Sequence, residues 1–226
     1  MPRPRALILD FNGTISDDEP LLYELIGNAL RDEVGVELDQ TFYEAELLGL
    51  SDPEIVERSL THAGHEPGED LVNRVLRAKI DAYKDEIRRE QRIEPGAIDF
   101  VRTLAAEVPL AIASGAFAEE IGMAIELAGI GGAFQAVVAI DDVDHGKPSP
   151  EGYELALARI NERRSLSRSI VARDVWAVED SLAGVTAAKA AQFTCGVIVG
   201  DERAEAAADF TVDELNEETA RELLAP

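Results

Sequence analysis

Cysteine and histidine are scarce in this chain. A single cysteine, Cys195, occurs among 226 residues, so the chain cannot close a disulfide on itself and a reducing compartment is the default expectation. Cys195 opens an apolar stretch, where we expect a buried core thiol. The three histidines, His62, His65 and His145, have no cysteine partners, which argues against a zinc site and favours surface positions.

Basic residues are also few, and long apolar runs are missing. Lys and Arg number 21 against 45 Asp and Glu, for a formal net charge of -24. A field of that sign repels nucleic-acid backbones and anionic lipid, so neither is an expected partner, and an anion site here needs a local cation. No stretch approaches the roughly 20 apolar residues of a membrane span, and no targeting segment is recognisable. We therefore expect a soluble, cytoplasmic protein.

The first recognisable element is a short apolar strand that ends in a carboxylate. Residues 6–9 (Ala-Leu-Ile-Leu) precede Asp10, and the loop behind it runs Phe-Asn-Gly-Thr. An apolar run this short, bounded by turn residues, is typical of a strand buried on both faces of a parallel sheet. Because open α/β sheets bind ligands at the carboxyl ends of such strands, Asp10 is a candidate for chemistry, although an ordinary helix-capping role fits the same position.

A block of helices follows this strand. Apolar residues recur at helical spacing in four segments, at 21–34, 41–48, 52–63 and 68–89, with glycine-containing breaks between them. Consecutive helices without an intervening strand pattern indicate a separate helical bundle, inserted after the first strand. We expect this insertion to span 16–91.

Beyond residue 92, strands and helices alternate. Strand patterns lie at 108–113, 136–139, 174–178, 194–199 and, more briefly, 210–212. This alternation predicts βαβ crossovers and a mostly parallel sheet. The fold class is therefore α/β, with residues 1–15 and 92–226 forming the core domain. We expect the acidic, alanine-rich segment 201–209 to be a solvated surface stretch.

Polar residues of distinct types follow four of the expected strands. Asp10, Ser114 and the pair Glu179–Asp180 stand at strand ends, and Lys147 lies in the loop after another strand. Each has an ordinary alternative, since the carboxylates and the serine could cap helices and the lysine could be a solvated loop residue. In a parallel sheet, however, these strand ends share one edge, so all four positions can converge on one site.

Together these side chains form a set suited to phosphate transfer. An aspartate can act as a nucleophile and form an aspartyl-phosphate, which splits one difficult displacement into two easier ones. Its charge repels an incoming phosphate, which calls for a hard cation such as Mg²⁺, held by Asp10, a nearby backbone carbonyl, and Glu179 or Asp180. The Lys147 ammonium and the Ser114 hydroxyl, with the backbone N–H groups that follow it, suit the phosphate oxygens.

Four ordered motifs resemble those of the haloacid dehalogenase-like hydrolase superfamily. They are Asp-Phe-Asn-Gly-Thr at 10–14, Ser-Gly at 114–115, Gly-Lys-Pro-Ser-Pro at 146–150 and Val-Glu-Asp-Ser at 178–181. The helical block between the first two is similar to the cap of the β-phosphoglucomutase and phosphoglycolate phosphatase branch. The resemblance implies a Rossmann-like core with a mobile, all-helical cap domain. It also implies a Mg²⁺-dependent hydrolase of a small phosphorylated metabolite, as a monomer or a homodimer.

The resemblance assigns roles to individual residues. It implies that Asp10 is the nucleophile and a metal ligand, that Asn12 occupies the catalytic position two residues further on, and that Lys147 is both catalytic and phosphate-binding. The other implied roles are substrate binding for Ser114, Gly115, Gly49 and Ser51, and metal binding for Asn12, Glu179 and Asp180. Gly49 and Ser51 match the cap loop that faces the active site in this branch.

Asn12 departs from the family pattern. Phosphatases and mutases of the family carry a second aspartate two residues after the nucleophile, which protonates the leaving oxygen and later activates water. An amide can present its backbone carbonyl to Mg²⁺ but cannot deliver a proton, a loss of roughly 10²–10⁴-fold for an alkoxide leaving group.

Several interpretations of Asn12 stay open. They are a weak phosphatase, a phosphatase for a special substrate with a good leaving group, a phosphate-binding or regulatory protein with little turnover, and an artificial substitution. Dehalogenases and phosphonatases also replace this residue. Dehalogenase chemistry fits less well because the pair Glu179–Asp180 is retained, and the cap lacks the extra lysine environment of a phosphonatase.

Overall fold

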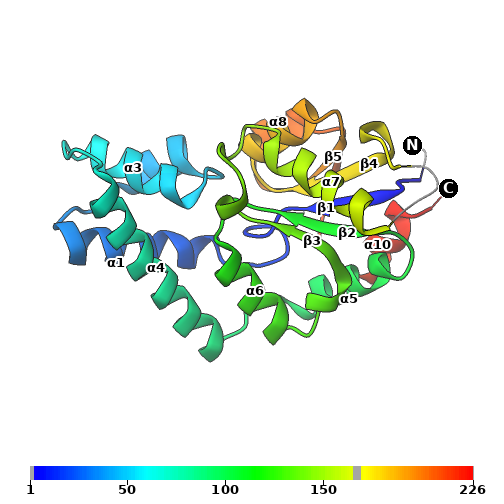
Figure 1. Cartoon of the computed structure of the whole chain (residues 1–226), viewed down its shortest axis with the longest axis horizontal. Coiled ribbons are helices and arrows are strands. Elements are labelled where there is room, and N and C mark those ends of the chain that lie inside the picture. The colour runs from blue at the N-terminus through cyan, green and yellow to red at the C-terminus, as the bar shows by residue number, and fades with distance from the viewer. Residues whose placement is uncertain (1–2, 165–168, 226) are drawn as a thin grey trace.

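Six parallel strands form one sheet in the computed structural model, which describes residues 3–164 and 169–225 (Figure 1). Their order across the sheet is β3-β2-β1-β4-β5-β6, with β1 central. Their bounds are Ala6–Leu9 for β1, Leu110–Ala113 for β2, Phe134–Val138 for β3, Val175–Glu179 for β4, Thr194–Ile198 for β5 and Phe210–Val212 for β6. The chain runs outward from β1 on one side and then on the other, so the strand order reverses beside β1, where open α/β sheets bind ligands.

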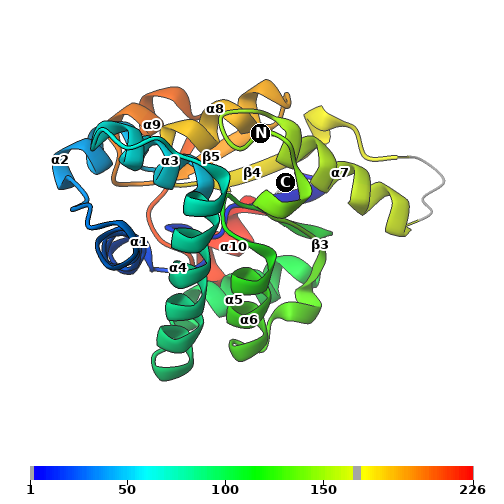
Figure 2. The same cartoon turned by 60° about the vertical axis from the view of Figure 1, so that its left-hand side comes forward.

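Helices cover both faces of the sheet (Figures 1 and 2). One layer contains α5 (Pro95–Ala105), α6 (Ala118–Leu127) and α10 (Glu217–Leu223), and the other contains α7 (Glu151–Arg164), α8 (Leu182–Ala190) and α9 (Glu202–Ala207). Short 3₁₀ turns lie at η2 (Gly131–Ala133), η3 (Ile140–Asp142) and η4 (Ala172–Asp174). Leu7 and Leu9 of β1 enter one apolar core and Ala6 and Ile8 the other, as the period of two in a strand requires. This doubly covered sheet confirms the Rossmann-like fold.

The helical insertion packs around an apolar core of its own, to one side of the sheet (Figure 1). It contains α1 (Glu19–Val34), α2 (Gln40–Phe42), the π-helical turn η1 (Tyr43–Leu47), α3 (Asp52–His62) and α4 (Glu69–Arg89). The long helix α4 begins with Glu69 and Asp70 and ends with Arg88 and Arg89, so charges of both signs complement its dipole. The all-helical insertion after β1 is thus present as expected.

Two segments differ from the sequence prediction. Residues 41–48 do not form one regular helix, because α2 passes into a π-helical turn in which the Leu48 N–H donates to the Tyr43 carbonyl at 3.0 Å. The segment 201–209 is not simply a solvated stretch. It contains α9, whose Ala204 is fully buried, and the Asp201 side chain accepts from the Arg203 N–H at the helix start. The small alanine side chains allow this short helix to pack closely.

A buried ion triad joins the insertion to the sheet domain. Lys79 of α4 is fully buried, and its ammonium donates to Asp52 at 2.7 Å and to Glu120 at 3.0 Å. Asp52 begins α3, whereas Glu120 belongs to α6. Burial alone would lower the pKa of Lys79, but the attraction of the two carboxylates is the stronger effect and raises this pKa above its usual range. Lys84, also on α4, forms a more exposed pair with Glu119 at 2.7 Å.

Replacing Lys79 by methionine should lower the free energy of unfolding by about 3–5 kcal/mol, because it leaves two buried carboxylates without a cation. Burial already raises the pKa of Glu120 to about 7 against the effect of Lys79, and without that cation the pKa of Glu120 rises further. Stability is therefore lost as the pH rises through this pKa, and the deficit should be larger at about pH 8 than at about pH 5. Urea unfolding of the variant and the unmodified protein at both pH values measures this difference in the free energy of unfolding.

Lys84→Met is the matched control on the same helix. Its ammonium is partly solvated, so its loss should cost less than about 1 kcal/mol at either pH. Equal destabilisation by the two substitutions would contradict a special role for the buried triad.

Candidate active site

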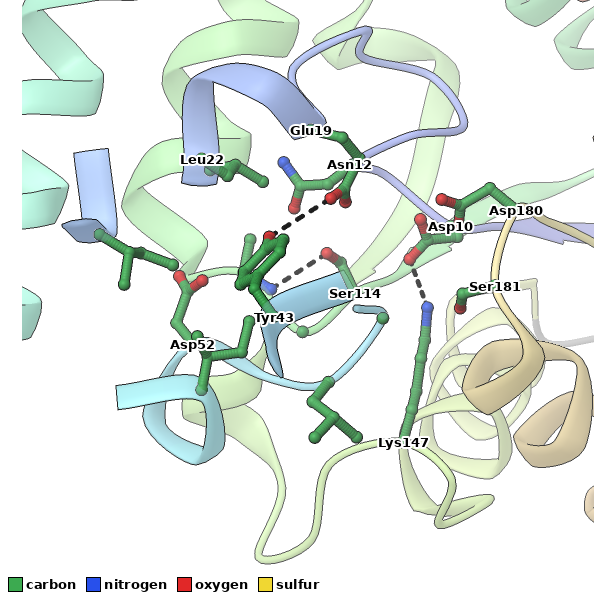
Figure 3. A pocket seen from close by; sticks show the side chains of 16 residues that line it. Asp10, Asn12, Glu19, Leu22, Tyr43, Asp52, Ser114, Lys147, Asp180 and Ser181 are labelled. Atoms are coloured by element: carbon green, nitrogen blue, oxygen red, sulfur yellow. Dashed lines mark hydrogen bonds and ion pairs between the residues drawn. The ribbon is translucent and has the colours of Figure 1, made fainter. Parts of the chain in front are cut away.

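Asp10 lies at the carboxyl edge of the sheet, where β1 ends. Its N–H donates to the Val178 carbonyl at 3.0 Å, which keeps it in register with β4, and the residue is 4% exposed. The Lys147 ammonium forms an ion pair with Asp10 (Figure 3). It forms a second ion pair with Glu179, at 2.6 Å. Burial raises the pKa of Asp10 to about 7 against the opposing effect of Lys147, and the Glu179 carboxylate adds to the rise.

Glu179, the last residue of β4, is fully buried beneath Asp10 and Lys147. Its carboxylate also accepts a hydrogen bond from the Tyr153 hydroxyl. A Cβ atom at Gly184 would lie 2.0 Å from the Glu179 carboxyl carbon, so α8 approaches this closely only because residue 184 is a glycine. Burial disfavours the Lys147 ammonium, but Asp10 and Glu179 raise its pKa above the usual range, so this cation stays charged.

Asp180 completes a cluster of three carboxylates. One oxygen from each of Asp10, Glu179 and Asp180 lies within 4.8 Å of the others. Burial raises the pKa of Asp180 well above its ordinary value, and the two neighbouring carboxylates add to this. Gly13, at a φ of 72°, leaves room for the cluster, since a Cβ there would lie 2.1 Å from Asp180 Oδ2. Oxygen donors that repel one another are stabilised by a hard divalent cation, so these residues fit Mg²⁺.

Asn12 is held by a buried carboxyl that the sequence did not single out. Its amide donates to Asp18 Oδ2 at 3.0 Å, and the same oxygen accepts from the Ser16 hydroxyl at 2.7 Å and the Tyr83 hydroxyl at 2.6 Å. Burial raises the pKa of Asp18 even though these three donors favour its ionised form. The Asn12 side chain is therefore oriented by its neighbours rather than free to turn in the loop.

Ser114 and Gly115 follow β2 at the same edge. The Ser114 N–H donates to the Val138 carbonyl at 3.0 Å, and its hydroxyl oxygen accepts from the Ala116 N–H at 3.1 Å (Figure 3). The hydroxyl proton is left to donate to a ligand. Ser114 thus points into the space between Asp10 and the insertion.

The loop at residues 49–51 packs closely against this edge of the sheet. A Cβ at Gly49 would lie 2.5 Å from that of Ser181, and a Cβ at Gly115 would lie 3.1 Å from Ser51 Cα. The Asp52 N–H donates to the Gly115 carbonyl at 3.4 Å. Gly49 has a φ of 82°, so glycine is required there both for the turn and for the close approach.

These contacts close the site into a small cavity between the sheet edge and the insertion. Its volume for solvent is about 30 Å³. A water needs at least about 10–15 Å³ by this measure, so the closed cavity holds only a few waters. A phosphate ester is larger than this space.

Glu19 and Tyr43 line the insertion side of the cavity (Figure 3). The Tyr43 hydroxyl donates to Glu19 Oε2 at 3.5 Å. Burial raises the pKa of Glu19 to about 7, and the carboxylates of Asp18, Asp10 and Asp52 add to the rise. The sequence showed Glu19 only as an acid in the first turn of a helix, and no local pattern distinguished it from its neighbours.

The sequence-predicted residues fall into two groups around this cavity. Asp10, Asn12, Ser114, Gly115, Lys147, Asp180 and Gly49 line it. Glu179 lies below the cavity as a partner of Lys147. Ser51, the last residue of the 49–51 loop, is buried outside the cavity lining, and its hydroxyl donates to Glu54 at 2.8 Å. The roles assigned to these residues stay predictions.

Comparison with known proteins decides the family. Residues 4–192 match the haloacid dehalogenase-like hydrolase family. The chain belongs to this family. The fold class and the branch expected from the motifs are confirmed as well. Along the part of this hydrolase that the structure describes, no helix is both long and apolar enough to cross a membrane.

Three relatives show the range of proteins that this hydrolase resembles. The phosphoglycolate phosphatase of Rhodobacter capsulatus is 27% identical over 168 residues, which cover 72% of this chain and 71% of the relative. The phosphorylated carbohydrates phosphatase of Thermotoga maritima is 27% identical over 199 residues, covering 82% and 81%. The crystal structure of a CbbY mutant from Rhodobacter sphaeroides with xylulose-1,5-bisphosphate superposes with a TM-score of 0.80 at 26% identity, covering 95% of this chain and 96% of the other.

Proposed function

We propose that this hydrolase cleaves a phosphate monoester of a small metabolite, with Asp10 as the nucleophile and Mg²⁺ as the cofactor. The observation that carries the proposal is the placement of three groups at one closed cavity: the Asp10 carboxylate, the Lys147 ammonium and the Asp180 carboxylate. The names of the relatives, which are phosphatases of phosphorylated small molecules, support it.

In the first step, a carboxylate oxygen of Asp10 forms a bond to phosphorus as the ester P–O bond breaks, and the leaving oxygen departs as an alkoxide that takes a proton from solvent. Lys147 balances the charge on the phosphoryl oxygens, and the Ser114 hydroxyl donates to one of them. Mg²⁺, when bound by Asp10, Glu179 and Asp180 with the Asn12 backbone carbonyl, supplies the positive charge that lets an anionic nucleophile meet an anionic substrate. Water then attacks phosphorus and loses a proton to solvent as the bond between phosphorus and the Asp10 oxygen breaks, which releases phosphate and restores the Asp10 carboxylate.

The presence of asparagine at position 12 favours a second candidate function, in which the protein binds a phosphorylated ligand and hydrolyses it slowly. Its amide is tied to Asp18 and transfers no proton to the leaving alcohol. An alcohol that must leave as an alkoxide departs more slowly by roughly 10²–10⁴-fold. The two candidates share one site and differ in rate.

The division into domains belongs to the same proposal. Residues 16–91 form the mobile cap, and residues 1–15 and 92–226 form the catalytic core, with the 49–51 loop meeting the core over the site. The cytoplasmic location and the choice between monomer and homodimer stay predictions.

The test is phosphate release by the purified protein from a panel of alkyl, aryl and acyl phosphates, with Mg²⁺ and after its removal with EDTA. We expect release with Mg²⁺, background rates in EDTA, and recovery when Mg²⁺ is restored. Activity that persists in EDTA would contradict the carboxylate cluster as a metal site. Calorimetric binding of phosphate esters without turnover would instead favour the second candidate.

A further inference from the structure

The cavity has cationic charge only on its sheet side. Among its described lining residues, Lys147 is the single cation, and it is already paired with Asp10 and Glu179. In the proposed reaction this end receives the phosphoryl group. The leaving alcohol must then lie on the opposite side, toward the insertion.

The insertion side carries two carboxylates instead. Glu19 begins α1 and Asp52 begins α3, and both line the cavity together with Tyr43 (Figure 3). Glu19 accepts a hydrogen bond from the Tyr43 hydroxyl at 3.5 Å, and no described lysine, arginine or histidine forms an ion pair with it. When the Glu19 carboxyl is ionised, no cation of the described chain forms an ion pair with it.

Asp52 does have a cation, but that cation is not available to a ligand. Lys79 is fully buried and is shared between Asp52 and Glu120, at 2.7 and 3.0 Å. Two carboxylates thus compete for one ammonium, and the triad presents no positive charge to the cavity. An anionic group placed beside Glu19 and Asp52 would meet carboxylates with no side-chain cation free to pair with it.

The other residues that line the insertion side of the cavity are apolar and strengthen the electrostatic effect of the carboxylates. Leu22, Ile26 and Ile55 line the cavity with apolar atoms. Charges interact more strongly in such surroundings than in water, so an uncompensated carboxylate there favours a cationic ligand and repels an anionic one.

We propose that the substrate is the phosphate ester of a small amino alcohol, whose protonated amine pairs with Glu19 beside Asp52. The inference rests on the proposed phosphatase function and adds the chemical class of the leaving alcohol. The proposed substrate differs from the ligands in the relatives' names, because phosphoglycolate carries a carboxylate and xylulose-1,5-bisphosphate a second phosphate.

The test uses esters matched in length that differ only in the charge of the far end. They are 2-aminoethyl phosphate, 2-hydroxyethyl phosphate and 2-phosphoglycolate, with the corresponding three-carbon compounds as a second set. For at least one length, kcat/KM should be about tenfold or more higher for the amine than for the hydroxyl, and lowest for the carboxylate. Equal rates for amine and hydroxyl at both lengths, or preference for the carboxylate, would overturn the proposal.

Glu19→Gln tests the residue that confers the preference. The amine-to-hydroxyl ratio should fall toward one in this variant, whereas Glu24→Gln, an exposed change on the same helix, should keep the ratio of the unmodified protein. An unchanged ratio in Glu19→Gln would exclude Glu19 as the partner of the amine.

Failure of the proposed function gives a different result from failure of this inference. If none of the esters releases phosphate, the hydrolase proposal fails, and calorimetric Kd values for the same compounds test the charge preference independently. Tightest binding of the amine supports the inference in that case, and tightest binding of the carboxylate overturns it.

Discussion

Replacement of Asp10 by asparagine should abolish phosphate release, with kcat reduced by on the order of 10⁴-fold or more. The amide is nearly the same size but lacks the anionic oxygen that must bond to phosphorus. Lys147 keeps Glu179 as a partner at 2.6 Å, and one member of a cluster of mutually repelling carboxylates is neutralised, so the fold should persist. Steady-state kinetics with circular dichroism on the same samples measures both effects.

A covalent readout makes this prediction specific to the nucleophile. Rapid acid quenching of the unmodified protein during turnover should leave one phosphoryl group on the peptide that contains Asp10, detectable by mass spectrometry, and Asp10→Asn should show none. Asp17→Asn, an exposed change a few residues along the same loop, should keep both the activity and the phosphopeptide. Full activity in Asp10→Asn, or a phosphopeptide elsewhere in the chain, would refute the mechanism.

Replacement of Asn12 by aspartate should raise kcat/KM for alkyl phosphates by roughly 10²–10⁴-fold, because it supplies an acid for the leaving alcohol. The Asn12 amide lies 3.0 Å from Asp18 Oδ2, so the new carboxyl would share a proton with Asp18. A like-charged neighbour raises the pKa of a carboxyl, which keeps the new acid protonated closer to neutral pH.

The dependence on the leaving group distinguishes this effect from a general improvement of the site. Acyl and nitrophenyl phosphates leave without protonation, so their rates should change far less than those of alkyl phosphates. Asn73→Asp, the same substitution at an exposed position on α4, should change neither the rate with alkyl phosphates nor the rate with acyl and nitrophenyl phosphates. No gain with alkyl phosphates would show that another group transfers the proton, and that Asn12 does not limit the rate.

Local sequence patterns were sufficient for the architecture. The apolar run at 6–9 and its later counterparts predicted buried parallel strands, because a strand enclosed by two helical layers needs apolar residues on both faces. The helical spacing between residues 21 and 89 predicted the insertion. Since parallel strands end at one edge, the positions of Asp10 and Ser114 around one cavity followed from their places at strand ends, and Lys147 joins them from the loop after β3.

The chemistry on the insertion side was decided by tertiary structure. Tyr83 reaches Asp18 across 65 residues of sequence, and Lys79 reaches Glu120 across 41, so no local pattern predicts either contact. Glu19 was indistinguishable from an ordinary acid at a helix start until the packing of α1 against η1 placed it in the cavity beside Tyr43. The sequence by itself therefore determined the fold and the family, and it named the residues that we propose for the phosphate end of the site. The charge that we propose to face the leaving alcohol depends on which side chains pair after folding, because only packing decides which carboxylates have a cation beside them.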